Sequence, residues 1–310
     1  MNLEHLRTLA AIVDEGSFEG AGFQLGVSPS AVSQRIKALE TSVGQLLVRR
    51  ETPCIPTPAG AAVVRLARQV QLLEAETWQQ LGQTPGRRSR IPVAVNADSL
   101  ATWFIPVFTE MAEWEDTVLD LHVEDQDHSS ALLRSGDVIG AITSDPRPIP
   151  GCSIETLGSM RYVAAATPAL AHRYTDSEGT PDWRRMPVIR FNDKDDLQHE
   201  VLRSHGVDMP ETIHTVPSSQ GFHEAVRAGL GWGMLPELQM GSDMQVGADV
   251  AQGRLQTLHA AVRPGSADGG LVAQEPVHRD VALYWQTWGL ESARLHRITA
   301  AIRKAAEGLR

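Results

Sequence analysis

The alternation of apolar and polar positions is most regular over residues 27–40, which read VSPSAVSQRIKALE. At 3.6 residues per turn, the apolar side chains gather on one face of a helix, which carries Val32, Ile36, Leu39 and Val43. Small, polar or basic side chains occupy the other side and its flanks: Ser30, Ser33, Gln34, Arg35, Lys37 and Thr41. Ser28 can cap this helix, and Pro29 suits its first turn. The pattern predicts a helix with one buried face and one slender polar face.

Two shorter helices are predicted before this stretch. Apolar residues recur at helical spacing over Leu3–Glu15 and again over Phe18–Leu25. Gly26 ends the second helix, which therefore forms a helix-turn-helix with the helix over residues 27–40. Residues 46–50 and 52–58 then predict a strand, a proline-bearing turn and a return strand. That arrangement is a wing.

The polar face of the third helix suits the major groove of DNA. Small hydroxyls permit close approach, while Gln, Arg and Lys reach base edges and phosphates. An ordinary solvated helix is the alternative, although such a helix more often carries paired Glu and Lys. The basic pair at the wing tip would meet phosphates or the minor groove, unless it is simply solvated. The predicted DNA contacts are Ser28, Ser30, Ser33, Gln34, Arg35, Lys37, Arg49 and Arg50.

A long helix is predicted over residues 59–81, followed by a linker. Its apolar side chains approach a heptad-like stripe: Val63, Leu66, Ala67, Val70, Leu73 and Trp78. We expect this helix to pack against a copy of itself in a homodimer, with packing onto its own chain as the alternative. Residues 82–90 (GQTPGRRSR) contain Pro, two Gly and three Arg, which predicts an exposed hinge.

From residue 91 the periodicity changes to that of an α/β body. Strands are predicted at 91–95, 118–124 and 138–143, with helices at 100–114 and 129–135 between them. This βαβαβ order implies a parallel sheet. A second α/β group follows, with strands at 161–166, 188–191, 213–216 and 231–235 and helices at 194–205 and 219–228. A strand at 281–288 and a helix at 291–310 close the chain, while the elements of 238–280 are not assigned.

Composition and charge limit the classes of protein to which this chain can belong. The chain has 310 residues, is 42% hydrophobic and carries a net charge of −10. Residues 1–90 hold ten Lys or Arg against eight Asp or Glu, so a near-neutral head precedes an acidic body, which fits a DNA-binding head. Two cysteines form no metal or disulfide framework, no apolar run approaches the roughly 18–20 residues of a membrane span, and no signal peptide is recognised. We therefore expect a cytoplasmic protein with no membrane association.

Enzyme functions find no support in the motifs. The chain shows no Gly-rich phosphate loop, no G-x-S-x-G elbow and no metal-ligand spacing. We therefore expect no catalytic residues, no metal and no cofactor. A secreted solute-binding protein is also disfavoured, because a wing is attached to the body.

The head sequence VSPSAVSQRIKALETSVGQLLVRR, followed by TPAG, resembles that of LysR-type transcriptional regulators. The segments VAVNADSLATWF, VEDQDHS, VPSSQGF, GLGWGMLPE and LYWQTW extend the resemblance along the whole chain, toward the ArgP/LysG branch. Members of that branch sense basic amino acids and control their export or metabolism. Most of the family has Ser-Arg-Gln in the recognition helix, whereas this chain has Ser33-Gln34-Arg35, as the branch does.

The resemblance implies a winged helix-turn-helix at 1–58, a linker helix and hinge at 59–90, and a two-lobed effector domain like a periplasmic binding protein. Lobe I would comprise 91–162 with 268–310, and lobe II 163–267. It also implies a homotetramer that binds double-stranded promoter DNA and acts on RNA polymerase. Alternatives are an architectural, nucleoid-type DNA binder without an effector, and a regulator that senses a different small carboxylate.

Polar residues at strand ends form the candidate effector site, because ligands of open α/β sheets bind at the carboxyl ends of strands. The candidates are Asn96, Asp98, Ser99, Glu124, Asp125, His128, Thr143, Ser218, Ser219 and Phe222. Hydroxyls near helix N-termini suit a carboxylate, so Ser99, Thr143, Ser218 and Ser219 would hold that group of an amino acid. Carboxylates suit cations, so Asp98, Glu124 and Asp125 would hold its ammonium groups.

Each of these residues has a plainer interpretation. Asp98 or Ser99 could simply cap a helix. Asp125, Asp127 and His128 could belong to a solvated loop. The large aromatics of the body, Trp232 and Trp285, are expected in the core. The acidic group Asp193, Asp195 and Asp196 is expected to be exposed charge at a helix start.

Overall fold

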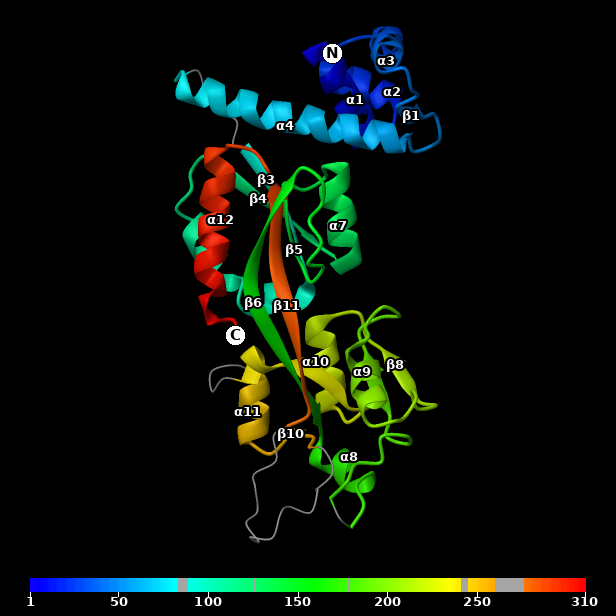
Figure 1. Cartoon of the computed structure of the whole chain (residues 1–310), viewed down its shortest axis with the longest axis vertical. Helices are drawn as coiled ribbons and strands as arrows, with labels where there is room; N and C mark the ends of the chain where they lie inside the picture. The colour runs from blue at the N-terminus through cyan, green and yellow to red at the C-terminus, as the bar shows by residue number, and fades with distance from the viewer. Residues whose placement is uncertain (83–88, 125, 178, 241–244, 260–275) are drawn as a thin grey trace. The chain divides into compact units, whose positions relative to one another are not determined.

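The computed structural model describes residues 1–82, 89–124, 126–177, 179–240, 245–259 and 276–310 (Figure 1). The chain forms two compact units. Unit 1 comprises Met1–Asn96, Val107–Glu155 and Tyr284–Lys304. Unit 2 comprises Ala97–Pro106, Thr156–Leu283 and Ala305–Arg310. The long strands β6 (Cys152–Ala166) and β11 (His278–Trp288) carry residues of both units, so each of these strands runs from one unit into the other.

The N-terminal head contains the three predicted helices and the wing. Helices α1 (Leu3–Glu15), α2 (Phe18–Leu25) and α3 (Pro29–Val43) are each capped by a side-chain oxygen, from Asn2, Ser17 and Ser28. Left-handed glycines at 16, 26 and 44 end them. Strands β1 (Val48–Arg49) and β2 (Ile55–Pro56) pair antiparallel and form the wing. The helix-turn-helix and the wing are therefore confirmed.

Helix α4 (Pro58–Gln80) begins inside the core of the head. Val64 and Ala67 are each 1% exposed and belong to the same apolar cluster as the buried residues of α1 and α3. A Cβ added at Gly60 would lie 1.8 Å from the carbonyl oxygen of Leu47, so only glycine permits this approach of α4 to the wing. The first half of α4 is therefore part of the head.

The predicted heptad-like stripe of α4 divides between two surroundings. Ala67 faces the core of the head, whereas Leu73 is 38% exposed and Trp78 is 48% exposed. The second half of the helix thus presents large apolar side chains that the described part of the chain leaves accessible to solvent.

A parallel sheet forms the rest of unit 1. Strand β3 (Ser89–Val95) pairs parallel with β4 (Thr117–Val123) and with β5 (Gly140–Thr143), which confirms the βαβαβ prediction. The Tyr284–Thr287 part of β11 pairs antiparallel with β5. Helices α7 (Gln126–Ser135) and α12 (Ala293–Ala305) also belong to this unit. Trp285 is 1% exposed and donates its Nε1 proton to Thr299 Oγ1 at 2.9 Å, so it is a core residue as expected.

One predicted helix, at 100–114, is wrong. Two short helices stand there, α5 (Ala97–Ala101) and α6 (Ile105–Met111), separated by a turn in which the carbonyl of Ser99 accepts from both Thr102 and Phe104. Pro106 explains the break, because a continuous helix would require an N–H at this position to bond the carbonyl four residues earlier.

The remaining strands lie in unit 2. Strand β6 pairs antiparallel with β9 (Gly233–Pro236) and with β10 (Gln256–Thr257), and these strands belong to the same sheet as β11 and β5. Strands β7 (Val188–Arg190) and β8 (Ile213–Thr215) pair parallel in a separate two-stranded sheet. Strand β6 has 15 residues, far longer than the predicted strand at 161–166. Besides α5, this unit contains the α-helices α8 (Pro168–Arg173), α9 (Leu197–Ser204), α10 (Ser219–Arg227) and α11 (Gln245–Ala251). The 3-10 turns are η1 (Glu237–Met240) and η2 (Ala306–Gly308). Trp232 is fully buried, as expected.

Some predictions fall on residues outside the described part of the chain. The hinge assigned to 82–90 lies there over 83–88, and the unassigned stretch 238–280 lies there over 241–244 and 260–275. Within the described ranges, no helix combines the length and apolar character needed to cross a membrane.

Candidate DNA interface and effector site

The two faces of α3 differ as the sequence predicts. Val32, Ile36 and Leu39 are at most 1% exposed and pack in the core of the head. The polar residues Ser30, Gln34 and Lys37 are exposed on the other side. At the start of the helix, Ser28 Oγ accepts the Ala31 amide at 3.3 Å and lies 2.9 Å from Ser30 Oγ. The head therefore presents a helix with accessible polar side chains beside its capped N-terminus.

Arg35 has a different environment from its neighbours. Its Nη1 lies 3.4 Å from Glu4 Oε2 and 3.4 Å from Thr8 Oγ1, both on α1, and its side chain is 26% exposed. The guanidinium thus ties α3 to α1 within the head. Its proposed phosphate contact would require it to share or leave this partner.

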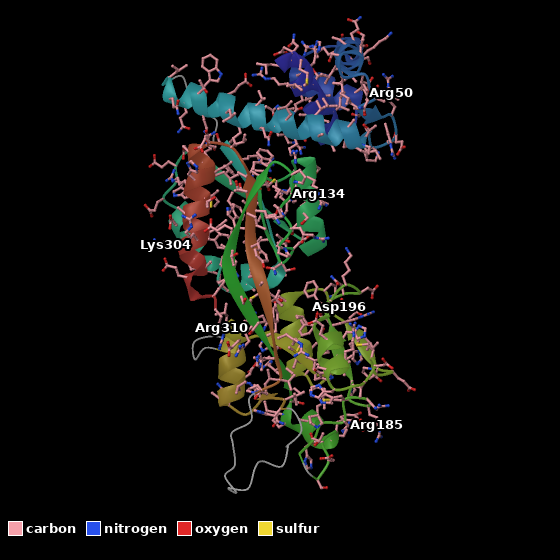
Figure 2. All side chains as sticks on the ribbon, viewed as in Figure 1. Arg50, Arg134, Arg185, Asp196, Lys304 and Arg310 are labelled. Carbon is pink, nitrogen blue, oxygen red and sulfur yellow. The ribbon has the colours of Figure 1, made fainter. Side chains whose placement is uncertain are left out.

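The wing carries Arg49 in β1 and Arg50 directly after it, and both are exposed. The guanidinium carbon of Arg50 lies 4.9 Å from the centroid of the Phe18 ring, at the start of α2. Figure 2 shows Arg50 at the edge of the head. This cation–π contact holds the arginine at a defined place beside the helix-turn-helix.

Three candidate effector residues meet at one edge of the unit 1 sheet. Val95 pairs with Val123 and Ala94 with Ala141, so Asn96, Glu124 and Thr143 stand at neighbouring strand ends. Asn96 and Thr143 are buried, and Glu124 is half-buried. Thr143 Oγ1 accepts the amide of Asp145 at 3.1 Å, so its hydroxyl oxygen also shapes the following turn. The structure therefore brings together the unit 1 residues that the strand-end rule selects.

A second group of candidates lies in unit 2, around Asp98 of α5. Ser219, the first residue of α10, donates its hydroxyl proton to Asp98 Oδ1 at 2.7 Å. Tyr162 of β6 donates to Asp98 Oδ2 at 3.0 Å. Both oxygens of the carboxylate are thereby fixed by neutral donors, and no positively charged partner of Asp98 is found among the described residues.

Burial raises the pKa of Asp98, and the hydrogen bonds from Ser219 and Tyr162 oppose this rise. The pKa of the Tyr162 hydroxyl is also raised, through burial and the charge of Asp98. A carboxylate that is costly to ionise gains more than an exposed one from an incoming cation. The cluster is therefore chemically suited to a guanidinium or ammonium group.

The remaining unit 2 candidates have structural roles in this arrangement. Ser218 caps α10 by accepting the Gly221 amide at 3.2 Å. Phe222 is 5% exposed and packs in a core cluster, where a Cβ on Gly233 would lie 2.5 Å from its ring. Ser99 is fully buried in α5.

Tyr162 is not among the site residues predicted from the sequence, and the predicted exposure of Asp195 is wrong. Tyr162 is the one residue with a polar tip in the buried run that ends β6, which is a usable signal. Asp193 and Asp196 are exposed as expected, but Asp195 is half-buried and accepts the amides of Phe191 at 2.8 Å and Leu197 at 3.2 Å. Burial raises the pKa of Asp195, and the charge of Asp98 contributes to the rise. Asp195 is thus a second carboxylate in the electrostatic neighbourhood of Asp98.

Two further candidates are Asp125 and His128. Asp125 lies outside the described residues, and so do the side chains of Asp127 and His128 in the first turn of α7.

Comparison with known proteins decides the family. Residues 3–61 match the bacterial regulatory helix-turn-helix proteins of the lysR family, and residues 85–307 match the LysR substrate binding domain. The chain is a LysR-type transcriptional regulator. It is 48% identical to the lysine export transcriptional regulatory protein LysG of Corynebacterium efficiens, over the full length of both chains.

Solved structures agree with the assignment of this regulator to the LysR family. ArgP from Mycobacterium tuberculosis is 41% identical, with a TM-score of 0.84 over 98% of this chain and 97% of that one. Full-length LysG from Corynebacterium glutamicum, solved with bound effector Arg, is 44% identical, with a TM-score of 0.80 over all of both chains. The predicted fold class and the resemblance to the ArgP/LysG branch are confirmed, and the regulator's relatives are named as transcriptional regulators, not as enzymes.

Proposed function

We propose that this regulator binds double-stranded promoter DNA through the outer face of α3 and the wing, and that arginine or lysine controls its action. The cationic end of the effector would bind Asp98 in unit 2. The observation that supports this most directly is the Asp98 carboxylate, which is held by Ser219 and Tyr162 and has no cationic partner among the described residues. A relative solved with Arg as its effector supports the same class of ligand.

The other candidates complete the proposal. The hydroxyls proposed for the effector carboxylate are those of Ser99, Ser218 and Ser219 in unit 2 and Thr143 in unit 1. The carboxylates of Glu124 and Asp125, like that of Asp98, are proposed for its ammonium groups. Asn96, His128 and Phe222 would line the site. Because one relative is named as a regulator of lysine export, the controlled gene is proposed to encode an amino-acid exporter. The DNA-bound regulator would then act on RNA polymerase.

Footprinting of the full-length protein on its own promoter tests this function. We expect a defined protected site whose pattern changes when arginine or lysine is added, and calorimetric binding of the same amino acids. An architectural DNA-binding protein would instead follow A·T content and ignore both amino acids. A footprint that responds only to a small carboxylate without a cationic group would contradict the basic effector.

Replacing Gln34 by alanine should relax base discrimination at one position of each half-site, by about 1–3 kcal/mol, because an exposed Gln on the groove-facing side can bond a base edge in two places. Arg50→Ala is the contrasting variant. It should weaken binding to all sequences alike and reduce the salt dependence, as loss of a phosphate contact does. Competition binding on a set of single-base operator variants measures both effects. Unchanged specificity in Gln34→Ala would show that the outer face of α3 is misassigned.

The exposed apolar residues of α4 support a homodimer through this helix, and two such dimers would form the proposed homotetramer. Leu73→Glu places a charge on that surface and should raise the dimer dissociation constant at least about tenfold, since burial of one leucine contributes about 1.5–3 kcal/mol. Analytical ultracentrifugation of the full chain measures it. Leu230→Glu, at a comparably exposed leucine of unit 2, is the matched control. Equal behaviour of the two variants would contradict an interface on α4.

A further inference from the structure

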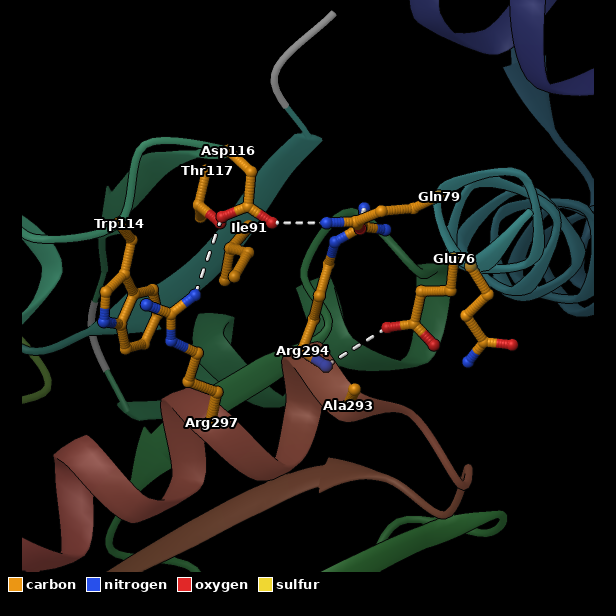
Figure 3. Close-up of a pocket in the computed structure, with 10 residues that line it drawn as sticks. Glu76, Gln79, Ile91, Trp114, Asp116, Thr117, Ala293, Arg294 and Arg297 are labelled. Atoms are coloured by element: carbon orange, nitrogen blue, oxygen red, sulfur yellow. Dashed lines mark hydrogen bonds and ion pairs between the residues drawn. The ribbon is translucent and has the colours of Figure 1, made fainter. Parts of the chain in front are cut away.

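Unit 1 contains a cavity of about 320 Å³ between the end of α4, the beginning of β4 and the first turn of α12. Its walls include Glu76, Gln79, Trp114, Asp116, Arg294 and Arg297 (Figure 3). None of these residues belongs to the candidate DNA interface or to the Asp98 cluster. A cavity of this size is at the lower end of the range that holds small ligands.

Arg294 is a buried cation with unused hydrogen-bond donors. The residue is 8% exposed, and its Nη2 donates to Gln79 Oε1 at 2.8 Å. Its Nε and Nη1 are buried without an acceptor among the described residues. Residues 83–88 (QTPGRR), which follow α4 along the chain, contain no carboxylate that could supply one. A buried guanidinium lacking acceptors is costly, so an acceptor at this place would be strongly favoured.

The two acids of the cavity wall have donors within the protein. Glu76 Oε1 accepts from Ser292 Oγ at 2.6 Å and from the Arg294 amide at 3.1 Å, so it caps the start of α12. Asp116 accepts from Gln79 Nε2 at 2.9 Å and from Thr117 Oγ1 at 3.0 Å. The Gln79 hydrogen bond in particular lowers the pKa of Asp116. The acids are thus already engaged, whereas Nε and Nη1 of Arg294 have no acceptor among the described residues.

A second arginine, Arg297, follows Arg294 by three residues on the same face of α12. Its guanidinium carbon lies 4.1 Å from the centroid of the Trp114 ring, and its Nη1 lies 3.6 Å from Asp116 Oδ1. Figure 3 shows Arg294 and Arg297 both rising from α12 on either side of Ile91. The loose contact with Asp116 leaves Arg297 able to engage a further acceptor.

We propose that this cavity binds a small oxyanion, through carboxylate or phosphate oxygens, with Arg294 as its principal partner and Arg297 as the second. The effector cluster around Asp98 is suited to a cation, so the two sites would take ligands of opposite charge. An anion held here would join the end of α4 to the start of α12. It would therefore give the regulator a second chemical input, at the end of the helix that carries the DNA-binding head.

Two anions distinguish the sources of such oxygens. Full-length protein is titrated with sodium pyruvate and, separately, with inorganic phosphate, at ionic strength held constant with sodium chloride. Calorimetry and thermal unfolding follow binding. We expect at least one anion to bind and to raise the unfolding temperature, pyruvate if the natural ligand is a carboxylate and phosphate if it is a phosphate. Absence of any response to both overturns the proposal.

Charge-changing variants locate the site. Arg294→Gln should weaken anion binding at least about tenfold. Arg303→Gln removes the same charge from α12 at an exposed position paired with Glu155, outside the cavity, and should leave binding unchanged. Asp116→Asn should act in the opposite direction and tighten binding several-fold, since it removes a negative charge that competes with the anion for Arg297. A merely structural role of these residues would not produce opposite signs.

Each result has one meaning. Equal anion binding in the three variants and the wild type means an adventitious ion only and overturns the proposal. If Arg294→Gln fails to fold, Asp116→Asn decides, and unchanged or weaker binding in that variant overturns the proposal. Arginine binding, measured in Arg303→Gln and Asp116→Asn, reports separately on the Asp98 cluster, so failure of one site is not mistaken for failure of the other.

Discussion

Asp98→Asn is expected to weaken arginine binding about a hundredfold, which corresponds to about 3 kcal/mol. The carboxylate is half-buried and its two oxygens are fixed by Ser219 and Tyr162, so little reorganisation is needed when a guanidinium arrives. Asparagine retains the shape and one acceptor oxygen but has no charge. Isothermal titration of the full-length protein measures the loss.

The same carboxylate should make arginine binding depend on pH. Burial raises the pKa of Asp98, and arginine would bind the ionised form. Affinity should therefore rise as the pH increases through this raised pKa and become constant above it, with a proton released on binding within that range. Asp98→Asn should lose this part of the dependence. Titrations in two buffers of different ionisation enthalpy measure the released proton.

The stability of the free protein provides the control. A raised pKa means that ionising Asp98 costs folding free energy above its ordinary pKa, so the unliganded Asp98→Asn protein should unfold at the same temperature or slightly higher near pH 8. Asp280→Asn, at an exposed aspartate paired with Arg161, removes one charge elsewhere in unit 2. If Asp280→Asn reduces arginine affinity as much as Asp98→Asn, the effect is general electrostatics and the site assignment is wrong.

The second large effect is expected at Asp249 of α11, where alanine should destabilise unit 2 by about 3 kcal/mol. Asp249 is fully buried, lies 3.0 Å from His223 Nε2 of α10 and forms an ion pair with Arg254. Alanine would leave His223 buried without this partner, whereas Arg254 is 42% exposed and can regain water. The predicted loss is therefore at the lower end for a broken buried charge pair.

Hydrogen exchange of the α10 amides measures this change locally, and the loss should be smaller in Asp249→Asn, which retains an acceptor. Arg227→Ala breaks an exposed pair with Glu224 on the same helix and should change stability by less than about 0.5 kcal/mol. Because α10 also carries Ser219 at its start, Asp249→Ala should in addition weaken arginine binding. Protection of α10 equal to that of the wild type would contradict a structural role for the Asp249 pair.

The parts of the fold that follow local rules could be predicted from the sequence. Caps at Ser17 and Ser28, glycine stops and the apolar spacing of Val32, Ile36 and Leu39 specify the head, because each acts within a few residues. The parallel strands followed from the order of elements. The break at Pro106 could also have been found locally, since proline is the strongest helix-breaking signal.

The candidate site depends on longer-range pairing, which periodicity does not encode. The sequence predicts Asp98 and Ser219 as strand-end and helix-start residues, but their direct hydrogen bond joins positions 121 residues apart. Tyr162 lies within the predicted strand 161–166, but its hydrogen bond to Asp98 joins positions 64 residues apart. The sequence predicts that Asp195 is exposed with its acidic neighbours, and only the tertiary fold distinguishes it from the exposed Asp193 and Asp196.

The start of α4 has a consequence for building hybrid regulators. Val64 and Ala67 complete the apolar core of the head, and Gly60 packs against the backbone of Leu47. A chimera joined at residue 58 would give the recombined head a foreign core and, wherever the donor lacks glycine, a steric clash. A junction beyond Ala67 would transfer the head together with the side chains of α4 that complete its core. DNA specificity could then be exchanged between relatives as one folded unit.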